Sequence, residues 1–204
     1  MSNTKYNTSP TLINSLLNFP KFAQNIYQCL YPDDLTITQE EIKPISLTGV
    51  CNEGPHNDFG FFVQDKRMML FVETQHVSPQ NALLRSMLYL AAAYSDFCIE
   101  NHLPVYKEFP VSLPRPEVFL ICTENNSEMP DTLQLFDPKD NSKPVSIKAK
   151  VLKYTGTGNV VDQYISFCQI RNQQEASCSE IEEAWSNTIQ ICSKEDILTQ
   201  FLHS

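Results

Sequence analysis

Asp58, Glu73 and Gln75 flank a hairpin-like stretch of the sequence and carry side chains that could do chemistry. Between them runs an apolar, strand-like segment that turns near residues 64–67. Side chains on a strand alternate between two faces, so Glu73 and Gln75 share one face and Thr74 points to the other. A carboxylate and an amide therefore lie side by side on what is otherwise an apolar sheet.

The register of this hairpin decides whether Asp58 joins them. A loop of two residues, Asp65 and Lys66, or a loop of four residues sets Asp58 directly opposite Glu73, with Cβ atoms ~4.5–5.5 Å apart. Like charges at that distance repel, so the pair would need a cation. A three-residue loop would instead bring Thr74 opposite Asp58 and remove the pairing.

Magnesium is the cation that suits two such carboxylates. Mg²⁺ prefers oxygen ligands, commonly takes one or two protein carboxylates and keeps positions for water and a substrate phosphate. It can activate that water and neutralise charge on a phosphoryl group. The pattern thus indicates a site for hydrolysis at a phosphoryl group, with Mg²⁺, or Mn²⁺, as the cofactor.

Each acidic residue also has a purely structural interpretation. Asp58 could cap a turn together with Asn57, and Glu73 could be a solvent-facing strand residue, although its neighbours on that face are apolar. His56 and His76 flank the hairpin, but neither has a partner at the spacing of metal ligands, so we interpret them as loop histidines.

The elements that must position these residues follow from the hydrophobic pattern. Ser78 and Pro79 are typical of a helix start, and Ser179 with a glutamate three residues on predicts a capped final helix. The sequence predicts one or two short helices within 9–31, a strand over 41–50, the hairpin, a helix over 80–101, strands from 116 and from 145, and helices within 160–174 and 179–202. This order predicts an α/β sandwich with a mixed sheet.

Composition supports one globular domain. The chain has 204 residues, of which 42% are hydrophobic, enough for one sizeable core. We expect a single domain over 1–204, with the core at about 10–155 and a helical part at about 159–204.

The cysteines and the amino-terminal sequence indicate the cellular compartment of the protein. Seven Cys without CxxC or CxxH spacing favour reduced thiols over a disulfide framework or a zinc site. The chain shows neither a leader-like start nor ~18 uninterrupted apolar residues. We therefore expect a soluble, cytoplasmic protein that does not contact a membrane.

The charge disfavours a simple DNA-binding module. A net charge of -9 and a pI of about 4.9 mean that the molecule as a whole repels phosphate backbones, so nucleic-acid binding needs a local basic patch or bridging cations. Lys148 and Lys150 share a strand face within a lysine-rich segment. They are candidate substrate contacts, or the protective lysines of an edge strand.

Arg85 and Tyr89 form a second candidate pair for substrate. They are four residues apart and so lie on one helical face. They could face a phosphate, or make an ordinary contact at the edge of the helix.

The segments NDFGFFV, LFVETQ and SPQNALLRSMLYLAAAY, in this order, resemble the PD-(D/E)xK nuclease family transposases, which include the Rpn-type recombination-promoting nucleases. The similarity extends from LLNFPKFAQNIYQCL through PRPEVFLICTEN to YISFCQI and AWSNTIQICSKEDILTQFL. It covers nearly the whole chain.

This resemblance implies a restriction-endonuclease-like core that cuts DNA with a divalent metal. By position, Asp58 would be the metal-binding aspartate, Glu73 the acidic member of the signature, and the Thr74 main-chain carbonyl a third metal ligand. Gln75 stands where the signature has lysine. An amide can orient water or a phosphate oxygen but brings no positive charge, so that role would fall to the metal or to Arg85.

Two functions follow as hypotheses, with a weaker third. The first is a metal-dependent DNA endonuclease with Asp58, Glu73 and Gln75 as catalytic residues. The alternative is a catalytically weak or inactive nuclease-fold protein that binds a nucleotide, a nucleic acid or a protein partner. The third is a structural subunit of a mobile-element complex. A homodimer is expected because the resembled fold often pairs two active sites.

Overall fold

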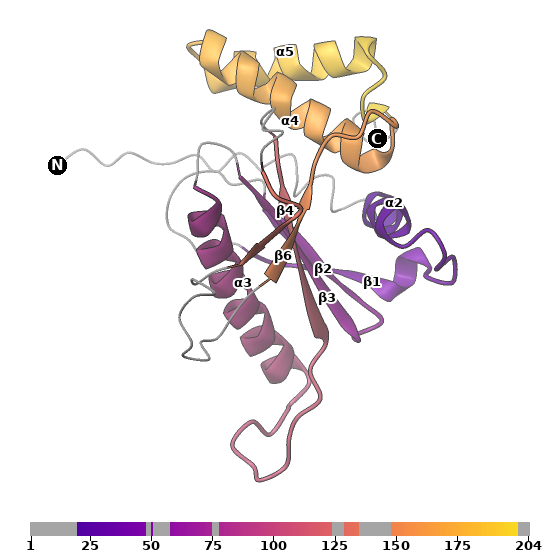
Figure 1. The fold of residues 1–204 in the computed structure, drawn as a ribbon, viewed down its shortest axis with the longest axis vertical. Helices are drawn as coiled ribbons and strands as arrows, with labels where there is room; N and C mark the ends of the chain where they lie inside the picture. Colours follow the sequence, from indigo (N-terminus) through magenta and orange to yellow (C-terminus); the bar gives the residue numbers. More distant parts are fainter. Residues whose placement is uncertain are drawn as a thin grey trace, which may run out of the picture.

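The computed structural model describes residues 20–47, 50, 58–74, 78–123, 129–134 and 148–199. Their strands form one mixed sheet with helices on both faces (Figure 1). In chain order the elements are α2 (Pro20–Leu30), the 3-10 turn η1 (Gln39–Glu41), β1 (Ile42–Ile45), β2 (Phe59–Val63), β3 (Arg67–Glu73), α3 (Pro79–Glu100), β4 (Arg115–Ile121), β5 (Thr132–Gln134), β6 (Lys148–Leu152), α4 (Val160–Ser177) and α5 (Ile181–Lys194).

The sheet combines antiparallel and parallel pairs in the order β1-β2-β3-β4-β6-β5. The first three strands are antiparallel neighbours, β4 runs parallel to β3, and β6 runs parallel to β4. Parallel neighbours need a crossover connection, which α3 supplies between β3 and β4. The predicted α/β class with a mixed sheet is confirmed.

Strand alternation divides the core between two sides of the sheet. Met69 and Phe71 of β3 pack with residues of α2 and α4. Met68, Leu70 and Val72 pack with residues of α3. Because both faces are covered, β3 is apolar along nearly its whole length, as the sequence shows.

The predicted long helix is α3. Pro79 occupies its first turn, and the Ser78 hydroxyl accepts a hydrogen bond from the Asn81 backbone N–H at 3.3 Å. In the described part of the chain, α3 is the one helix that could cross a membrane by length and composition. Its buried residues pack against the sheet, as those of a core helix in a soluble protein do.

The hairpin turn differs from the prediction and changes the register. The turn comprises the three residues Gln64–Lys66, and the ladder pairs Phe59 with Phe71. Gln64 does not pair with Arg67, because its N–H donates to the Glu41 carbonyl at 2.9 Å and its backbone is left-handed, with φ 52°.

If the β2–β3 pairing is extended by one residue beyond Phe59 and Phe71, Val72 stands opposite Asp58. The predicted pairing of Asp58 with Glu73 is therefore wrong. The other predicted pairing, with Thr74, is not observed either, because the turn begins one residue earlier than expected.

Two further predictions need correction. The three-residue strand β5 was not expected, and it pairs antiparallel with β6 at the sheet edge. The amino-terminal cap of α5 is Glu180, without a side-chain hydrogen bond, and not Ser179. The predicted helices within 9–31 correspond to α2 in part, because residues 1–19 lie outside the described ranges.

Candidate functional site

Asp58 lies just before β2, is only 7% exposed and is surrounded by protein donors. Its Oδ1 accepts hydrogen bonds from the Glu73 backbone N–H at 2.8 Å and from Arg85 Nη2 at 3.4 Å. Its Oδ2 accepts one from the Tyr89 hydroxyl at 2.9 Å and lies 3.1 Å from Arg85 Nε. Both carboxylate oxygens are thus engaged by this chain.

Arg85 joins the helix α3 to the end of the sheet. Besides its contacts to Asp58, its Nη2 donates to the Glu73 carbonyl oxygen at 2.6 Å. Arg85 and Tyr89 share a helical face, as the sequence predicted, but that face is directed at Asp58. The guanidinium supplies the cation that a buried carboxylate needs.

Glu73 lies on the other side of the sheet, against α4. Burial, followed by the charges of Cys168 and Glu73, raises the pKa of Tyr164 well above its usual range. Burial and then the charge of Glu73 raise the pKa of the Cys168 thiol in the same way. Asp58 and the Glu73 backbone are in contact at one end of the sheet. Their side chains lie on opposite sides: Asp58 bonds to α3, and Glu73 faces α4.

Thr74 extends the pairing of β3 with β4. Its N–H and its hydroxyl both donate to the Ile121 carbonyl, at 3.1 and 3.2 Å. Gln75 lies outside the described residues, as do His56 and His76, so their roles stay predictions.

The described residues do not fit the predicted Mg²⁺ site. A metal on Asp58 would have to displace Arg85 or Tyr89, because the lone pairs of both carboxylate oxygens already accept protein donors. Glu73 is turned toward α4, and within the described ranges no group of three or more His, Cys, Asp or Glu side chains could hold a metal. The Asp58 centre is an ion pair with Arg85 in which each carboxylate oxygen also accepts a hydrogen bond from this chain.

Lys148 and Lys150 belong to a different surface. Both are exposed on β6 while Ala149 between them is buried, so they share one strand face as predicted. The ladders place two arginines on the same side of the sheet, since Arg67 of β3 pairs with Arg115 of β4, and Phe119 of β4 pairs with Lys150. We call this surface the basic face: Arg67, Arg115, Lys148 and Lys150.

An aromatic ring and two carboxylates lie within or beside the basic face. Arg67 Cζ lies 4.7 Å from the centre of the Tyr31 ring, and Lys150 Nζ lies 5.9 Å from it. The Tyr31 hydroxyl donates to Glu117, whose carboxylate lies 3.6 Å from Arg67. Burial and the Glu117 hydrogen bond raise the pKa of Tyr31 to about 12. Asp34 also interacts with Arg67, so the four cations face two carboxylates.

The predicted substrate residues thus form two groups. At ~3.3 Å per strand residue, Arg67 lies roughly 20 Å along β3 from Glu73. Lys150 stands two strands away from β3, level with Phe71. Arg85 and Tyr89 lie on the α3 side of the sheet, whereas Lys148 and Lys150 lie on the other side. Sequence analysis missed Arg67, which follows the hairpin turn, and Arg115, which directly precedes the strand predicted from 116, because the pairing of β3 with β4 is not local.

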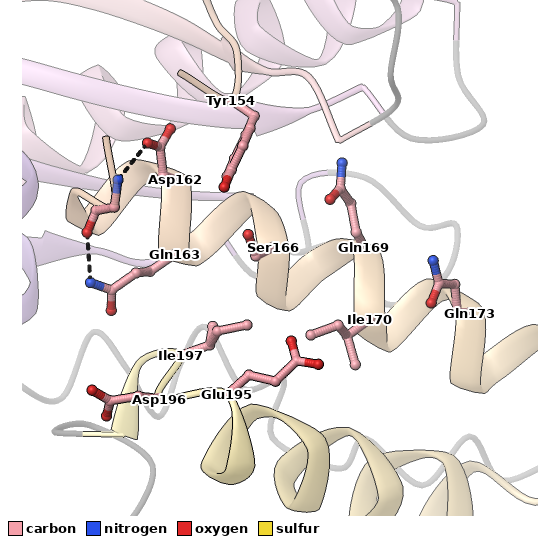
Figure 2. A pocket seen from close by; sticks show the side chains of 11 residues that line it. Tyr154, Asp162, Gln163, Ser166, Gln169, Ile170, Gln173, Glu195, Asp196 and Ile197 are labelled. Atoms are coloured by element: carbon pink, nitrogen blue, oxygen red, sulfur yellow. Dashed lines mark hydrogen bonds between the residues drawn. The ribbon is translucent and has the colours of Figure 1, made fainter. Parts of the chain in front are cut away.

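Asp162 is a second buried carboxylate that sequence analysis did not single out. It lies in the first turn of α4, is 1% exposed and accepts hydrogen bonds from the loop before the helix (Figure 2). The backbone N–H groups of Thr155, Thr157 and Gly158 donate to it at 2.7, 2.7 and 3.0 Å, and both threonine hydroxyls add bonds. Burial alone would raise its pKa, but these bonds outweigh burial and lower it.

A groove of about 530 Å³ runs beside this loop, between α4 and the end of α5 (Figure 2). Its polar lining includes Ser166, Gln169, Gln173 and Glu195. Asp162 lines its end, but its oxygens accept donors from the chain. None of the residues that the sequence marked as candidates lines this groove.

Comparison with known proteins adds no relative: no family model, curated protein or solved structure matches this chain.

Proposed function

We propose that this chain is a nuclease-like α/β protein that binds nucleic acid through its basic face and does not hydrolyse it. The observation that carries the proposal is the gathering of four cations on one sheet face of a protein whose net charge is -9. In such an acidic molecule, nucleic-acid binding needs a local patch of this kind.

The spacing of the basic face suits a phosphate backbone. Lys148 and Lys150 stand about 7 Å apart along β6, and Arg67 and Arg115 sit on strands ~4.8 Å apart. Arginine and lysine side chains on such a grid can each neutralise a phosphate of a strand laid across the sheet, and every neutralised phosphate releases a counterion. Half-buried Tyr31 adds a ring between two of the cations.

The Asp58 centre supports binding without hydrolysis. Catalysis of the predicted type needs a free carboxylate edge for a metal, whereas Asp58 is bonded to Arg85, to Tyr89 and to the backbone of β3. In this proposal Asp58 holds α3 against the sheet. Free thiols at the described cysteines agree with a reducing, cytoplasmic location, which is part of the proposal.

Fluorescence anisotropy with labelled single- and double-stranded DNA tests the binding proposal. The double variant Lys148→Gln/Lys150→Gln should bind more weakly, and the slope of log K against log salt should fall by about 1.4–1.8 because two phosphate contacts are lost. Lys43→Gln is the matched control, since Lys43 pairs with Asp65 at the opposite sheet edge. Equal affinity and slope in the double variant and the wild type would overturn the proposal.

A metal-dependent DNA endonuclease is the second candidate. It is favoured by the convergence of Asp58 and the Glu73 backbone at one sheet end and by the resemblance to PD-(D/E)xK nucleases. Supercoiled and linear DNA should be incubated at low salt with Mg²⁺ or Mn²⁺, beside Asp58→Ala and Glu73→Ala variants folded to the same degree. We expect no metal-dependent cutting. Cutting that both substitutions abolish would establish the endonuclease instead.

A further inference from the structure

The segment from 101 to 114, between α3 and β4, exposes large apolar side chains. It projects away from the sheet and the other helices (Figure 1). Tyr106 is fully exposed, Phe109 is 77% exposed, and Val105 and Leu113 are also exposed. We call residues 104–110 the arm. Because the arm lies beyond the body of the molecule, folding of the chain leaves these side chains in water.

The outer side of α3 continues this apolar surface. Leu84, Leu88 and Ile99 are all exposed, and their spacings of 4 and 11 residues put them on one side of the helix. Ile99 lies in the last turn of α3, five residues before the arm begins. Helix and arm together form one exposed apolar strip.

The strip is large enough for a stable interface. An aromatic side chain buries ~150–250 Å², so Tyr106 and Phe109 alone supply roughly half of the ~800 Å² that each partner contributes to a standard interface. The aliphatic side chains of α3 and the arm add to this area. Soluble monomers rarely expose contiguous apolar patches of more than a few hundred Å².

The arm is chemically complementary to itself. Its tip, Tyr106-Lys107-Glu108-Phe109, places a cation and an anion between two aromatic rings, and all four residues are exposed. About a two-fold axis, the same patch of two copies is in contact, and the two chain segments run in opposite directions. Lys107 of each copy then faces Glu108 of the other copy, and Tyr106 of each copy faces Phe109 of the other.

We infer that the arm is a dimerisation element and that its partner is a second copy of this chain. The two arms pair antiparallel about a two-fold axis, with the exposed side of α3 flanking the contact. This inference uses neither the basic face nor the Asp58 centre, so it stands apart from the proposed function.

The mass of the full chain in solution, measured by sedimentation over about 1–100 µM, tests the inference. The wild type should sediment as a dimer, and Tyr106→Ser/Phe109→Ser should be monomeric throughout. Leu35→Ser is the control, because Leu35 is 74% exposed but lies on the loop between α2 and η1. A monomeric wild type, or a dimer that survives the arm substitutions, would overturn the inference.

Charge exchange tests the antiparallel pairing itself. Lys107→Glu places four carboxylates at the contact and should weaken the dimer at least tenfold. Lys107→Glu/Glu108→Lys reverses the order of the charges, preserves self-complementarity and should restore the wild-type affinity. Both variants change only exposed residues, so each should fold. If the double variant stays as weak as Lys107→Glu, the antiparallel pairing is incorrect.

Discussion

Asp58 and Asp162 are two buried carboxylates that the protein satisfies in different ways. Asp58 is held chiefly by one guanidinium and one phenol from α3, together with a single backbone N–H from β3. Asp162 is held instead by three backbone N–H groups and two hydroxyls from one loop, all of them neutral donors. One centre relies on formal charge across distant segments, and the other relies on local dipoles.

This difference predicts that the two centres lose different amounts of stability when one residue is substituted. In the Asp58 centre a single residue carries the compensating charge, so its loss leaves a buried anion unpaired. In the Asp162 centre the bonds are distributed over a short loop, and each donor contributes a modest share. A helix amino-terminus also favours negative charge, and Asp162 lies in the first turn of α4.

Removing Arg85 should have the largest effect. We expect Arg85→Met to lower the free energy of unfolding by about 3–5 kcal/mol, because Asp58 would stay buried without its cation. Urea unfolding followed by circular dichroism measures the change. Arg115→Met, at an exposed position, is the control. Asp58→Asn/Arg85→Met should recover part of the loss. Equal stability of the two single variants would contradict the ion pair.

Substitution of Asp162 should have the next largest effect. Asp162→Asn keeps the shape but replaces one acceptor oxygen by an amide NH2 group, which cannot accept hydrogen bonds from the loop donors. We expect a loss toward the upper end of about 1.5–3 kcal/mol, the range for hydrogen bonds to a charged group, because several donors lose their acceptor. Asp96→Asn on α3 is the matched control, since the Asp96 side chain is exposed. A loss no greater than that of the control would show that the loop does not need the carboxylate.

The contribution of Asp162 should depend on pH in a defined direction. Its pKa in the folded protein lies below the ordinary value of 3.8, so the stabilisation is fully present above pH 3.8 and is lost as the pH falls through the lower folded value. The difference in unfolding free energy between the wild type and Asp162→Asn should therefore be constant near neutral pH and shrink in acid. A difference that grows in acid would reverse the assigned sign.

The hydroxyl of Tyr89 should have the smallest effect. Tyr89→Phe removes one hydrogen bond to Asp58 and should cost about 1.5 kcal/mol, the lower limit for a charged acceptor. Tyr94→Phe is the matched control, because the Tyr94 hydroxyl donates to the neutral Pro114 carbonyl at 2.7 Å and should cost about 1 kcal/mol. If Tyr94→Phe were the more costly, Asp58 would not bind Tyr89 as a carboxylate.

Sequence patterns predicted most elements because their signals are local. Ser78 and Pro79 mark the start of α3, two apolar strand-like runs mark the hairpin, and alternation marks β6. The spacing of Arg85 and Tyr89 puts both on one helical side. The short strand β5 was missed, since three residues carry too little pattern. The register was missed because the Gln64 N–H is tied to the Glu41 carbonyl, a contact between segments far apart in the chain.

The sequence by itself determined the α/β class, the acidic surface charge and the carboxylates at the hairpin, because composition and strand period depend on near neighbours. Only the tertiary structure decided that Arg85 neutralises Asp58, that Glu73 faces α4 and that two arginines join Lys148 and Lys150. Each of these outcomes depends on strand register and on which helix covers which face. A shift of one residue moves every side chain of a strand to the other face of the sheet.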